Sequence, residues 1–417
     1  MSIDLVIRNA STLEGEHGVD LAIHQGKIVA KQANLEMQGQ REIDSGGNLV
    51  IPGFVESHVH LDIALMNNDK KPGRPEPYLS HYGLNESLER RRKLFTSEDI
   101  IQRASKAIKM ASRHGVTAMR AQCHVDPDVG LKHVQALAVV KQAYANLIDL
   151  QLVGFPQQGL HKNKAVISLY EEAFKSGLLD VMGCASNLDR SGNFKAHIDQ
   201  AFEIAATFDV DLDAHVDLGL LDDVSFESLE VVHLARQTLE TGYQGRVTAG
   251  HVSTLDSASP DVAERTISLI HEAQLNVVSQ PDLYRLGRDD QKHVRRGLTR
   301  VKDLLSAGVN VTFASNNVRD ALRPFGNFNL LEEGLVLAQG AHMDMVDDLE
   351  NLLRMCTVNA AKALRLSGYG LDVGCQADLV VLDAPSASAA IVNQAEKQYV
   401  IKAGHLVAFN RVLSESF

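Results

Sequence analysis

Hydrophobic and polar positions follow one pattern at the two ends of the chain and another in its centre. The ends carry short alternating segments separated by Gly, Asn and charged residues, which is typical of antiparallel strands and turns. Because the two ends share this texture, they predict one small β-sandwich built from residues 1–52 and 370–417. Its strands are expected at 4–8, 20–23, 27–30, 47–51, 377–383 and 399–408.

The centre of the chain, residues 53–369, alternates strands with helices. Thr96 is expected to cap the start of one helix, Gly115 to end it, and Val116 to start the strand that follows. Eight such strands, each followed by helical sequence, predict an α/β fold of the (β/α)8, TIM-like barrel type rather than an open doubly wound sheet. The strands are expected at 54–60, 116–119, 149–155, 180–185, 210–215, 246–251, 275–279 and 309–313.

Composition and charge narrow the possible partners. The net charge is −12, and the acidic residues are dispersed rather than gathered in a tail, which argues against nucleic-acid binding. No apolar run approaches the ~20 residues that cross a bilayer, and the first residues do not have the pattern of a signal peptide. We therefore expect a cytoplasmic protein with no membrane role. The four cysteines lack any CxxC spacing, so neither disulfides nor a thiolate metal site is expected.

Three further segments carry concentrated positive charge. The clusters at 90–93 and 292–296 are expected to be solvated helix faces, given the negative charge around them. The loop at 67–77 follows the first barrel strand and is expected to roof the site, where its basic residues could meet an anionic substrate. A solvated, proline-rich loop remains the alternative for this last segment.

The first barrel strand carries the most informative chemistry. An apolar, β-rich run ends in His58 and His60, which are two residues apart. Side chains at positions i and i+2 of a strand point to the same face. Both imidazoles can therefore close on one metal ion while Val59 packs the other way. This spacing favours a metal site over two structural histidines.

Other polar residues follow the predicted strands where they end, and the ends of barrel strands carry the chemistry in this fold. On the strand of His215, the acidic residues at 211, 213 and 217 share its parity, so this polar face should point into the barrel. Single strand-end histidines are more often hydrogen-bonded structural residues. His251 could be such a partner, and Gln157 could only cap a loop. The candidates in chain order are His124, Gln157, His215, Asp217, His251, Asn316 and Asn317.

Taken in order, five segments resemble the amidohydrolase superfamily, and most closely its cytosine deaminase and N-isopropylammelide amidohydrolase branch. They are 52–62, 155–159, the strand ending at His215, 246–251 and 318–326. The resemblance implies one divalent transition metal, zinc or iron, held by His58, His60, His215 and a residue at position 316. Such an ion lowers the pKa of bound water from 15.7 to about 7, which gives a hydroxide nucleophile.

The same resemblance implies roles for the remaining candidates. His251 would orient the nucleophile or polarise the substrate, and Gln157 would bind the edge of a cyclic amide, with His124 and Asn317 as further substrate contacts. The absence of a lysine from the fourth strand fits a single metal ion. The implied partner is a small heterocyclic molecule, and we expect a homo-oligomer.

Two positions depart from that family pattern, and on the second strand the alignment of residues 120–126 is ambiguous by two residues. Asn316 stands where the resemblance implies a catalytic aspartate, and an amide can ligate through its oxygen but cannot act as a carboxylate base. Leu218 stands where the deaminases have a proton-shuttle glutamate, so Asp217 is expected to substitute. The leading hypothesis is a metal-dependent hydrolase of C–N bonds in a cyclic amide, amidine or aminated heterocycle. The alternative is a catalytically weak or inactive homologue that binds a heterocycle or a partner.

Overall fold

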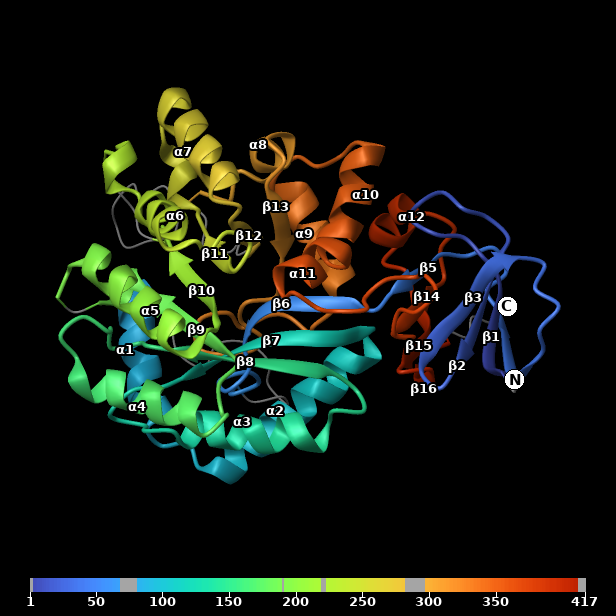
Figure 1. Cartoon of the computed structure of the whole chain (residues 1–417), viewed down its shortest axis with the longest axis horizontal. Helices are drawn as coiled ribbons and strands as arrows, with labels where there is room; N and C mark the ends of the chain where they lie inside the picture. Colours follow the sequence, from blue (N-terminus) through green and yellow to red (C-terminus); the bar gives the residue numbers. More distant parts are fainter. Residues whose placement is uncertain (1–2, 68–80, 190, 219–222, 282–296, 412–417) are drawn as a thin grey trace, which may run out of the picture.

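A parallel barrel forms the larger part of the molecule. The computed structural model describes residues 3–67, 81–189, 191–218, 223–281 and 297–411. Eight strands lie side by side in chain order, and each neighbouring pair from β6 to β13 is parallel. This confirms the predicted (β/α)8 architecture (Figure 1). The strands are β6 (Phe54–His60), β7 (Val116–His124), β8 (Asp149–Phe155), β9 (Val181–Ala185), β10 (Asp211–Val216), β11 (Val247–His251), β12 (Asn276–Ser279) and β13 (Asn310–Phe313).

The barrel closes between β6 and the segment that follows β13. The main-chain N–H of Asn316 donates to the carbonyl of His58 at 3.0 Å, and the N–H of His60 donates to the carbonyl of Asn316 at 2.8 Å. Deeper in the barrel, the hydroxyls of Ser57 and Thr312 lie 2.9 Å apart. The closure therefore runs directly beside the two histidines of the first strand.

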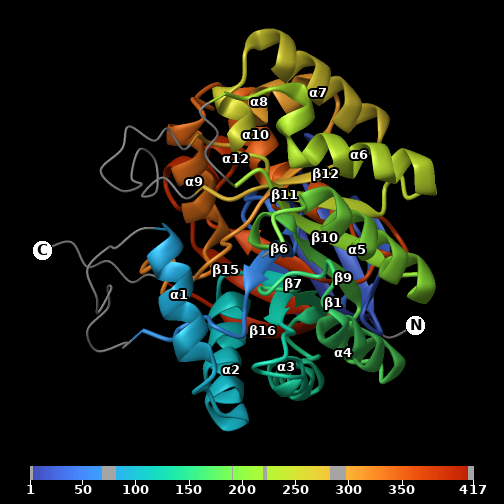
Figure 2. The same cartoon turned by 90° about the vertical axis from the view of Figure 1, so that its left-hand side faces the viewer.

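Helices cover the outside of the barrel (Figure 2). In α2, the Thr96 hydroxyl accepts the Asp99 N–H at 3.2 Å, as the sequence predicts. Gly115 ends this segment with φ +85°, and a Cβ there would lie 2.9 Å from Val380. The helices are α1 (His81–Arg92), α2 (Ser97–Arg113), α3 (Lys132–Ala143), α4 (Lys164–Lys175), α5 (Phe194–Phe208), α6 (Glu230–Thr241), α7 (Pro260–Glu272), α8 (Val301–Ser306), α9 (Leu330–Gly340), α10 (Val346–Met355), α11 (Val358–Ala363) and α12 (Ala387–Val392).

Residues from both ends of the chain form a β-module beside the barrel (Figure 1). One sheet has the order β3-β2-β1-β4 and the other β16-β15-β14-β5. Leu5, Ile7 and Leu21 of the first sheet share one buried cluster with Leu379 and Val381 of the second. The strands are β1 (Ile3–Ala10), β2 (Val19–His24), β3 (Lys27–Ala33), β4 (Gly39–Asp44), β5 (Val50–Pro52), β14 (Leu379–Leu382), β15 (Lys397–Lys402) and β16 (His405–Phe409).

Two details of the module differ from the prediction. Strand β4 was not expected, because its residues 39–42 are polar and mostly exposed and lack apolar alternation; it pairs in parallel with β1. The single strand expected at 399–408 is a hairpin of β15 and β16. Ala403 and Gly404 turn the chain with φ +47° and +79°, the left-handed values that tight hairpin turns require.

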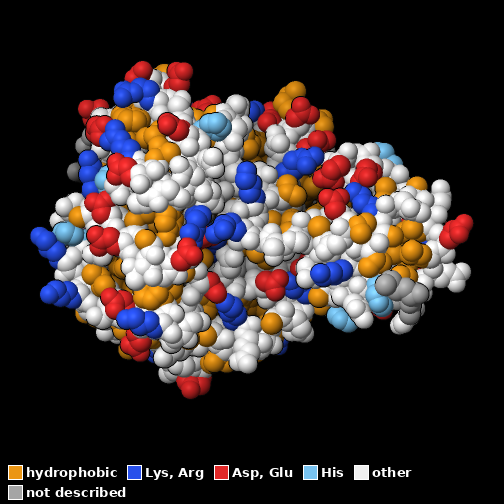
Figure 3. All heavy atoms as spheres, in the orientation of Figure 1, with side chains coloured by type: hydrophobic (Ala, Val, Ile, Leu, Met, Phe, Trp, Pro, Cys, Tyr) orange, Lys and Arg blue, Asp and Glu red, His pale blue; other side chains and the backbone are white. Residues whose placement is uncertain are grey.

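Acidic and basic side chains are interspersed over the face drawn in Figure 3. Across the described ranges, no helix is long and apolar enough to cross a bilayer. All four cysteines are free, and Cys375 alone is partly exposed. The basic cluster at 292–296 and the roofing loop from residue 68 onward lie outside the described residues.

Candidate metal centre and substrate pocket

Three imidazoles converge at the carboxyl end of the barrel. The Nε2 atom of His215 on β10 lies 3.0 Å from Nε2 of His58 and 3.2 Å from Nε2 of His60, both on β6. Imidazole nitrogens bound to zinc lie about 2.0–2.1 Å from the ion. One ion between the three rings would therefore hold their nitrogens apart by roughly the N–N distances of 3.0 and 3.2 Å found here. The three ring nitrogens thus have the spacing that a single ion needs.

The protonation of this cluster also suits a metal. Burial, with the neighbouring imidazole His58 adding to it, lowers the pKa of both His60 and His215 well below the ordinary value. Neutral imidazoles offer a lone pair, which a metal ligand must have. The donor set therefore fits a divalent transition metal.

A second layer of polar residues orients His58. Its Nδ1 atom lies 3.3 Å from Oδ1 of Asp213 and 3.4 Å from the amide of Gln122. Asp213 in turn accepts a hydrogen bond from Gln122 at 3.0 Å and pairs with Arg120 at 3.3 Å. Partners of this kind fix the ring so that its other nitrogen faces the ion. Parity along β10 places Asp213 in the barrel as expected, whereas Gln122 and Arg120 were not identified from the sequence.

A pocket opens above the three histidines, and the structure brings most of the candidates to it. Its lining has an amide and imidazole side and an apolar side, and no carboxylate occurs among the described lining residues. The polar side is His60, His124, Gln157, Asn187, His215, His251, Asn316 and Asn317. The apolar side is Ile63, Leu88, Phe155, Leu188, Leu218 and Leu322.

Asn316 and His251 both reach this pocket from unusual backbone conformations. Asn316 has φ +56° and His251 has φ +73°, a left-handed conformation that is uncommon for residues other than glycine and is enriched in asparagine, aspartate and histidine. The ring of His251 lies 5.4 Å from that of His215 and 6.2 Å from that of His58, measured between centroids. It is therefore placed next to the metal cluster, close to where a reacting atom would lie.

Asp217 does not reach the pocket. Its carboxylate faces the start of α6, where it accepts the N–H of Glu230 at 2.8 Å and that of Val231 at 3.0 Å. The parity argument stops at this residue because Asp217 has φ +54°, which ends the alternation of the strand. The side chain caps a helix, and this placement does not supply the proton shuttle that was expected.

Asp217 and Glu230 form a buried pair of carboxyl groups. Glu230 accepts the Asp217 N–H through Oε2 at 2.7 Å. Burial raises the pKa of Asp217 to about 6. Burial and the nearby charge of Asp217 raise the pKa of Glu230 to about 8. The hydrogen bonds of this pair join the end of β10 to the start of α6, so the pair affects the stability of the fold.

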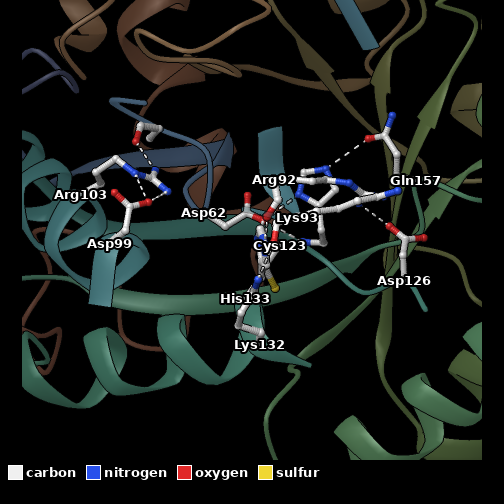
Figure 4. A network of polar contacts seen from close by, with 12 residues as sticks. Asp62, Arg92, Lys93, Asp99, Arg103, Cys123, Asp126, Lys132, His133 and Gln157 are labelled. Carbon is white, nitrogen blue, oxygen red and sulfur yellow. Dashed lines mark hydrogen bonds and ion pairs between the residues drawn. The ribbon is translucent and has the colours of Figure 1, made fainter. Parts of the chain in front are cut away.

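Gln157 and His124 lie together on the opposite side of the pocket. The Gln157 amide is 3.2 Å from Nε2 of His124. The Nδ1 atoms of His124 and His133 are each 2.7 Å from Oδ2 of Asp62 (Figure 4). That oxygen also accepts the main-chain N–H of His124 at 2.9 Å. Since three donors already point at this oxygen, Asp62, His124 and His133 form a hydrogen-bonded network rather than a second metal site.

Arg92 extends this network and corrects one expectation. The cluster at 90–93 was expected to be a solvated face, and Arg90 is exposed, but Arg92 is fully buried. It donates to Asp126 at 2.6 Å (Figure 4) and to Asp128 at 3.2 Å. A buried guanidinium needs such charged partners, and they lie on the loop after β7.

Gln280 is another buried residue that sequence reasoning missed. It follows β12, and neither end of its amide has a hydrogen-bond partner among the described residues. Its Nε2 atom lies 3.2 Å from where a Cβ of Gly250 would be, a point that is also 3.7 Å from Cε1 of His58. The amide therefore points into the barrel beside the metal cluster. Gln280 is far along the sequence from the other site residues, so no local sequence pattern marks it.

Comparison with known proteins defines the family. The chain belongs to the amidohydrolase family, since the profile described as "Amidohydrolase family" matches residues 68–408. It is 31% identical over 418 residues to the N-isopropylammelide isopropyl amidohydrolase of Pseudomonas sp. (strain ADP), with 98% of each chain covered. Members and relatives are named as amidohydrolases and deaminases, and the chain is accordingly an enzyme acting on carbon–nitrogen bonds other than peptide bonds.

Two solved structures resemble the chain over almost all of its length. The 5-methylcytosine deaminase of Klebsiella pneumoniae, liganded with phosphonocytosine, has a TM-score of 0.89 and 31% identity, covering 99% of this chain and 100% of that chain. The N-isopropylammelide isopropylaminohydrolase of Burkholderia multivorans has a TM-score of 0.85 and 25% identity, covering 98% and 99%. These likenesses confirm the superfamily branch that the sequence motifs indicate.

Proposed function

We propose that the chain is a metal-dependent hydrolase that cleaves a C–N bond of a small, uncharged heterocycle, releasing ammonia or an amine. The observation that carries this proposal is the convergence of three imidazole nitrogens within 3.0 and 3.2 Å beneath a pocket lined by amides. His58, His60 and His215 would hold one zinc or iron ion, with the Asn316 amide oxygen as a further ligand. When bound, such an ion acidifies water and polarises a carbonyl or amidine group.

The residues of the pocket divide the remaining work. Gln157 and Asn317 can hydrogen-bond the edge of a planar ring and hold it over the cluster. His251 lies next to His215 and can accept a proton from the attacking water and return it to the leaving nitrogen. With Asp217 turned toward α6, His251 is the best placed residue for this proton transfer.

The lining also indicates the class of substrate. The described lining combines amide and imidazole groups with apolar side chains, which suits a neutral ring that is hydrogen-bonded at its edge and covered on its faces. Leu88, Leu188, Leu218 and Leu322 form an apolar wall that suits an alkyl substituent. The names of the relatives, which refer to N-isopropylammelide and 5-methylcytosine, support alkylated triazines and pyrimidines as the first compounds to try.

The test is a turnover screen with purified, zinc-loaded or iron-loaded chain. The panel is a set of aminated and alkylaminated hydroxytriazines and pyrimidines, with release of ammonia or amine as the readout. His215→Ala serves as the matched control, because it removes one nitrogen from the cluster and changes only one of the lining side chains. We expect turnover of at least one compound that His215→Ala abolishes. Equal rates for the two proteins would refute a metal-dependent reaction.

One observation favours a second candidate function. The described pocket lining contains no carboxylate, and Asn316 stands where the resemblance implies an aspartate. A catalytically weak homologue that mainly binds its heterocycle fits this lining. Calorimetric binding of a panel compound with no measurable hydrolysis would select this candidate over the first.

A further inference from the structure

One buried carboxylate joins the loops that follow β8 and β9. The two strands are neighbours in the barrel (Figure 1), and Asp189 ends a short 3-10 helix, Ser186–Leu188, that follows β9. Its Oδ2 atom accepts the main-chain N–H of Leu160 at 3.2 Å and that of His161 at 3.1 Å. Leu160 and His161 belong to the loop after β8. Asp189 therefore holds that loop against the segment after β9.

His197 of α5 holds the same carboxylate from a third element. Its Nε2 atom accepts the main-chain N–H of Ala185, the last residue of β9, at 3.1 Å. A ring nitrogen that accepts a hydrogen bond carries no proton, so the neutral ring has its proton on Nδ1, which lies 2.8 Å from Oδ2 of Asp189. The N–H of Leu160, 3.2 Å from both atoms, then donates to Oδ2. Burial lowers the pKa of His197, which favours this neutral form.

Gly159 allows the loop after β8 to approach Asp189 this closely. It has φ +82°, and a Cβ at this position would lie 2.6 Å from Oδ2 and 2.9 Å from Cα of Asp189. A larger residue would therefore push the two segments apart. The N–H of Gly159 donates to the carbonyl oxygen of Pro156 at 3.0 Å and closes a tight turn that contains Gln157. The turn that carries Gln157 thus rests directly on Asp189.

A second turn, formed by the segment after β9, brings another amide residue to the substrate pocket. The N–H of Asp189 donates to the carbonyl oxygen of Ser186 at 3.2 Å, which closes the turn that carries Asn187 and Leu188. Both of these residues line the pocket, as Gln157 does. Asn187 is exposed, whereas Asp189 is buried. This turn therefore has a buried anchor and places an amide residue at the pocket.

Two turns, each with an amide residue at the pocket, thus meet at one carboxylate. We propose that Asp189 is a positioning residue that locks the two turns together, so that Gln157 and Asn187 bind the substrate as one preorganised pair. Side chains that are held in place before binding lose less conformational freedom when the ligand arrives. The inference deepens the proposed function and rests on it for the statement that the two amides contact the substrate.

A pair of carboxamides favours one class of heterocycle. Each carboxamide offers an acceptor oxygen and a donor NH2 group, which together match a ring edge that carries a carbonyl oxygen beside an N–H. Two such side chains on neighbouring loops suit a ring with two edges of this kind, as in an amino- or alkylamino-substituted dioxotriazine. A ring with a single such edge leaves one amide unpaired in the complex, which weakens binding.

The first test reads the coupling of the two turns without a substrate. Hydrogen exchange on the full chain, followed by mass spectrometry, reports the opening of peptides that cover residues 157–163 and 184–192. Asp189→Ala is expected to raise the exchange rate of both peptides by about tenfold, because both turns lose the carboxylate that joins them. Faster exchange in the second peptide alone would overturn the proposal.

Two further variants give a matched control and a second approach to the contact. The hydroxyl of Ser191 donates to Oδ1 of Asp189 at 2.6 Å, so Ser191→Ala should loosen only the segment after β9. An effect on peptide 157–163 as large as in Asp189→Ala would indicate general loosening and contradict the proposal. Gly159→Ala pushes the turns apart but keeps the carboxylate, so both peptides should again exchange faster. This variant decides if Asp189→Ala does not fold, and an effect confined to 157–163 would count against the coupling.

The second test separates positioning from a structural role, using a compound of the panel that the chain binds or hydrolyses. Asp189→Ala should lower kcat/KM, or raise the calorimetric Kd, by at least about tenfold. The same change in the double variant Gln157→Ala, Asn187→Ala should have an effect within about twofold, because the groups through which Asp189 acts are gone. Equal losses in both backgrounds would refute the proposal. Absence of binding and turnover would refute the proposed function, and hydrogen exchange would still decide whether Asp189 joins the two turns.

Discussion

The main-chain N–H of His60 donates a hydrogen bond of 2.8 Å to the carbonyl oxygen of Asn316. This bond closes the barrel, so residue 316 is positioned by the fold rather than by the chemistry of its side chain. Its φ of +56° is one that asparagine and aspartate adopt more readily than most residues. Replacing Asn316 by aspartate should therefore keep the backbone geometry and change only the charge and the basicity of the side chain.

Asn316→Asp is expected to fold, to retain metal more tightly and to increase turnover by at least about tenfold, because a positioned general base contributes on the order of 10²–10⁴ in rate. The measurements are kcat and metal content after dialysis. Asn317→Asp is the control. The Asn317 amide donates to Asp320 at 2.7 Å, so that change would place two buried carboxylates together and destabilise the chain. Slower turnover with unchanged metal content in Asn316→Asp would contradict this account.

Asp217→Ala tests the placement of a residue that the sequence assigned to catalysis. Its carboxylate caps α6 through Glu230 and Val231, and loss of a cap costs about 1 kcal/mol, up to about 2. We expect the free energy of unfolding in urea to fall by that amount while kcat stays within about twofold. A large loss of kcat with unchanged stability would return Asp217 to the catalytic machinery.

The buried Glu230 carboxyl makes stability depend on pH. Its pKa is raised from 4.5 in the unfolded chain to about 8 in the folded one. A raised carboxyl pKa means that the folded state holds the proton more tightly. The contribution of the protonated Glu230 carboxyl to the free energy of unfolding is therefore complete below about pH 4.5. It is lost as the pH rises toward about 8, because the unfolded chain ionises first. Glu230→Gln, which cannot ionise, should flatten this dependence in urea unfolding measured across that range. An equally steep slope in the variant would assign the effect to another group.

Gln280→Met should stabilise the chain. Both ends of the Gln280 amide are buried and have no partner within the part of the chain that the structure describes, and an unsatisfied buried polar group costs about 1–3 kcal/mol. Methionine has nearly the same shape and no such cost, so the midpoint of urea unfolding should rise. If stability rises and activity falls, the amide contacts the substrate or its water. A loss of stability would show that the amide has a partner in the folded protein.

The sequence predicted those parts of the site that depend on strand periodicity. His58, His60, His215 and Asp213 lie on strands, and parity alone places them inside the barrel. The order of eight strands likewise follows from the alternation of strands with capped helices. These predictions need only local geometry, which the amino-acid pattern records.

The remaining features depend on contacts between distant residues or on single backbone angles. Asp217 leaves the expected face because its own backbone is left-handed, with φ +54°, and the amino-acid pattern does not record this angle. His133 lies on helix α3 and meets Asp62 across 71 positions of sequence, so neither shows a local sign of the other. Arg92 looked like one member of a basic cluster, and its burial depends on Asp126 in another loop.

The most direct test of the central claim is the metal content of the purified chain. Protein prepared without chelators and without added metal is analysed by elemental mass spectrometry, with His215→Ala as the control. The convergence of the nitrogens of His58, His60 and His215 predicts about one transition metal ion per chain and a loss of most of it in the control. A folded, metal-free chain that also fails to take up zinc or iron would contradict the proposed hydrolase.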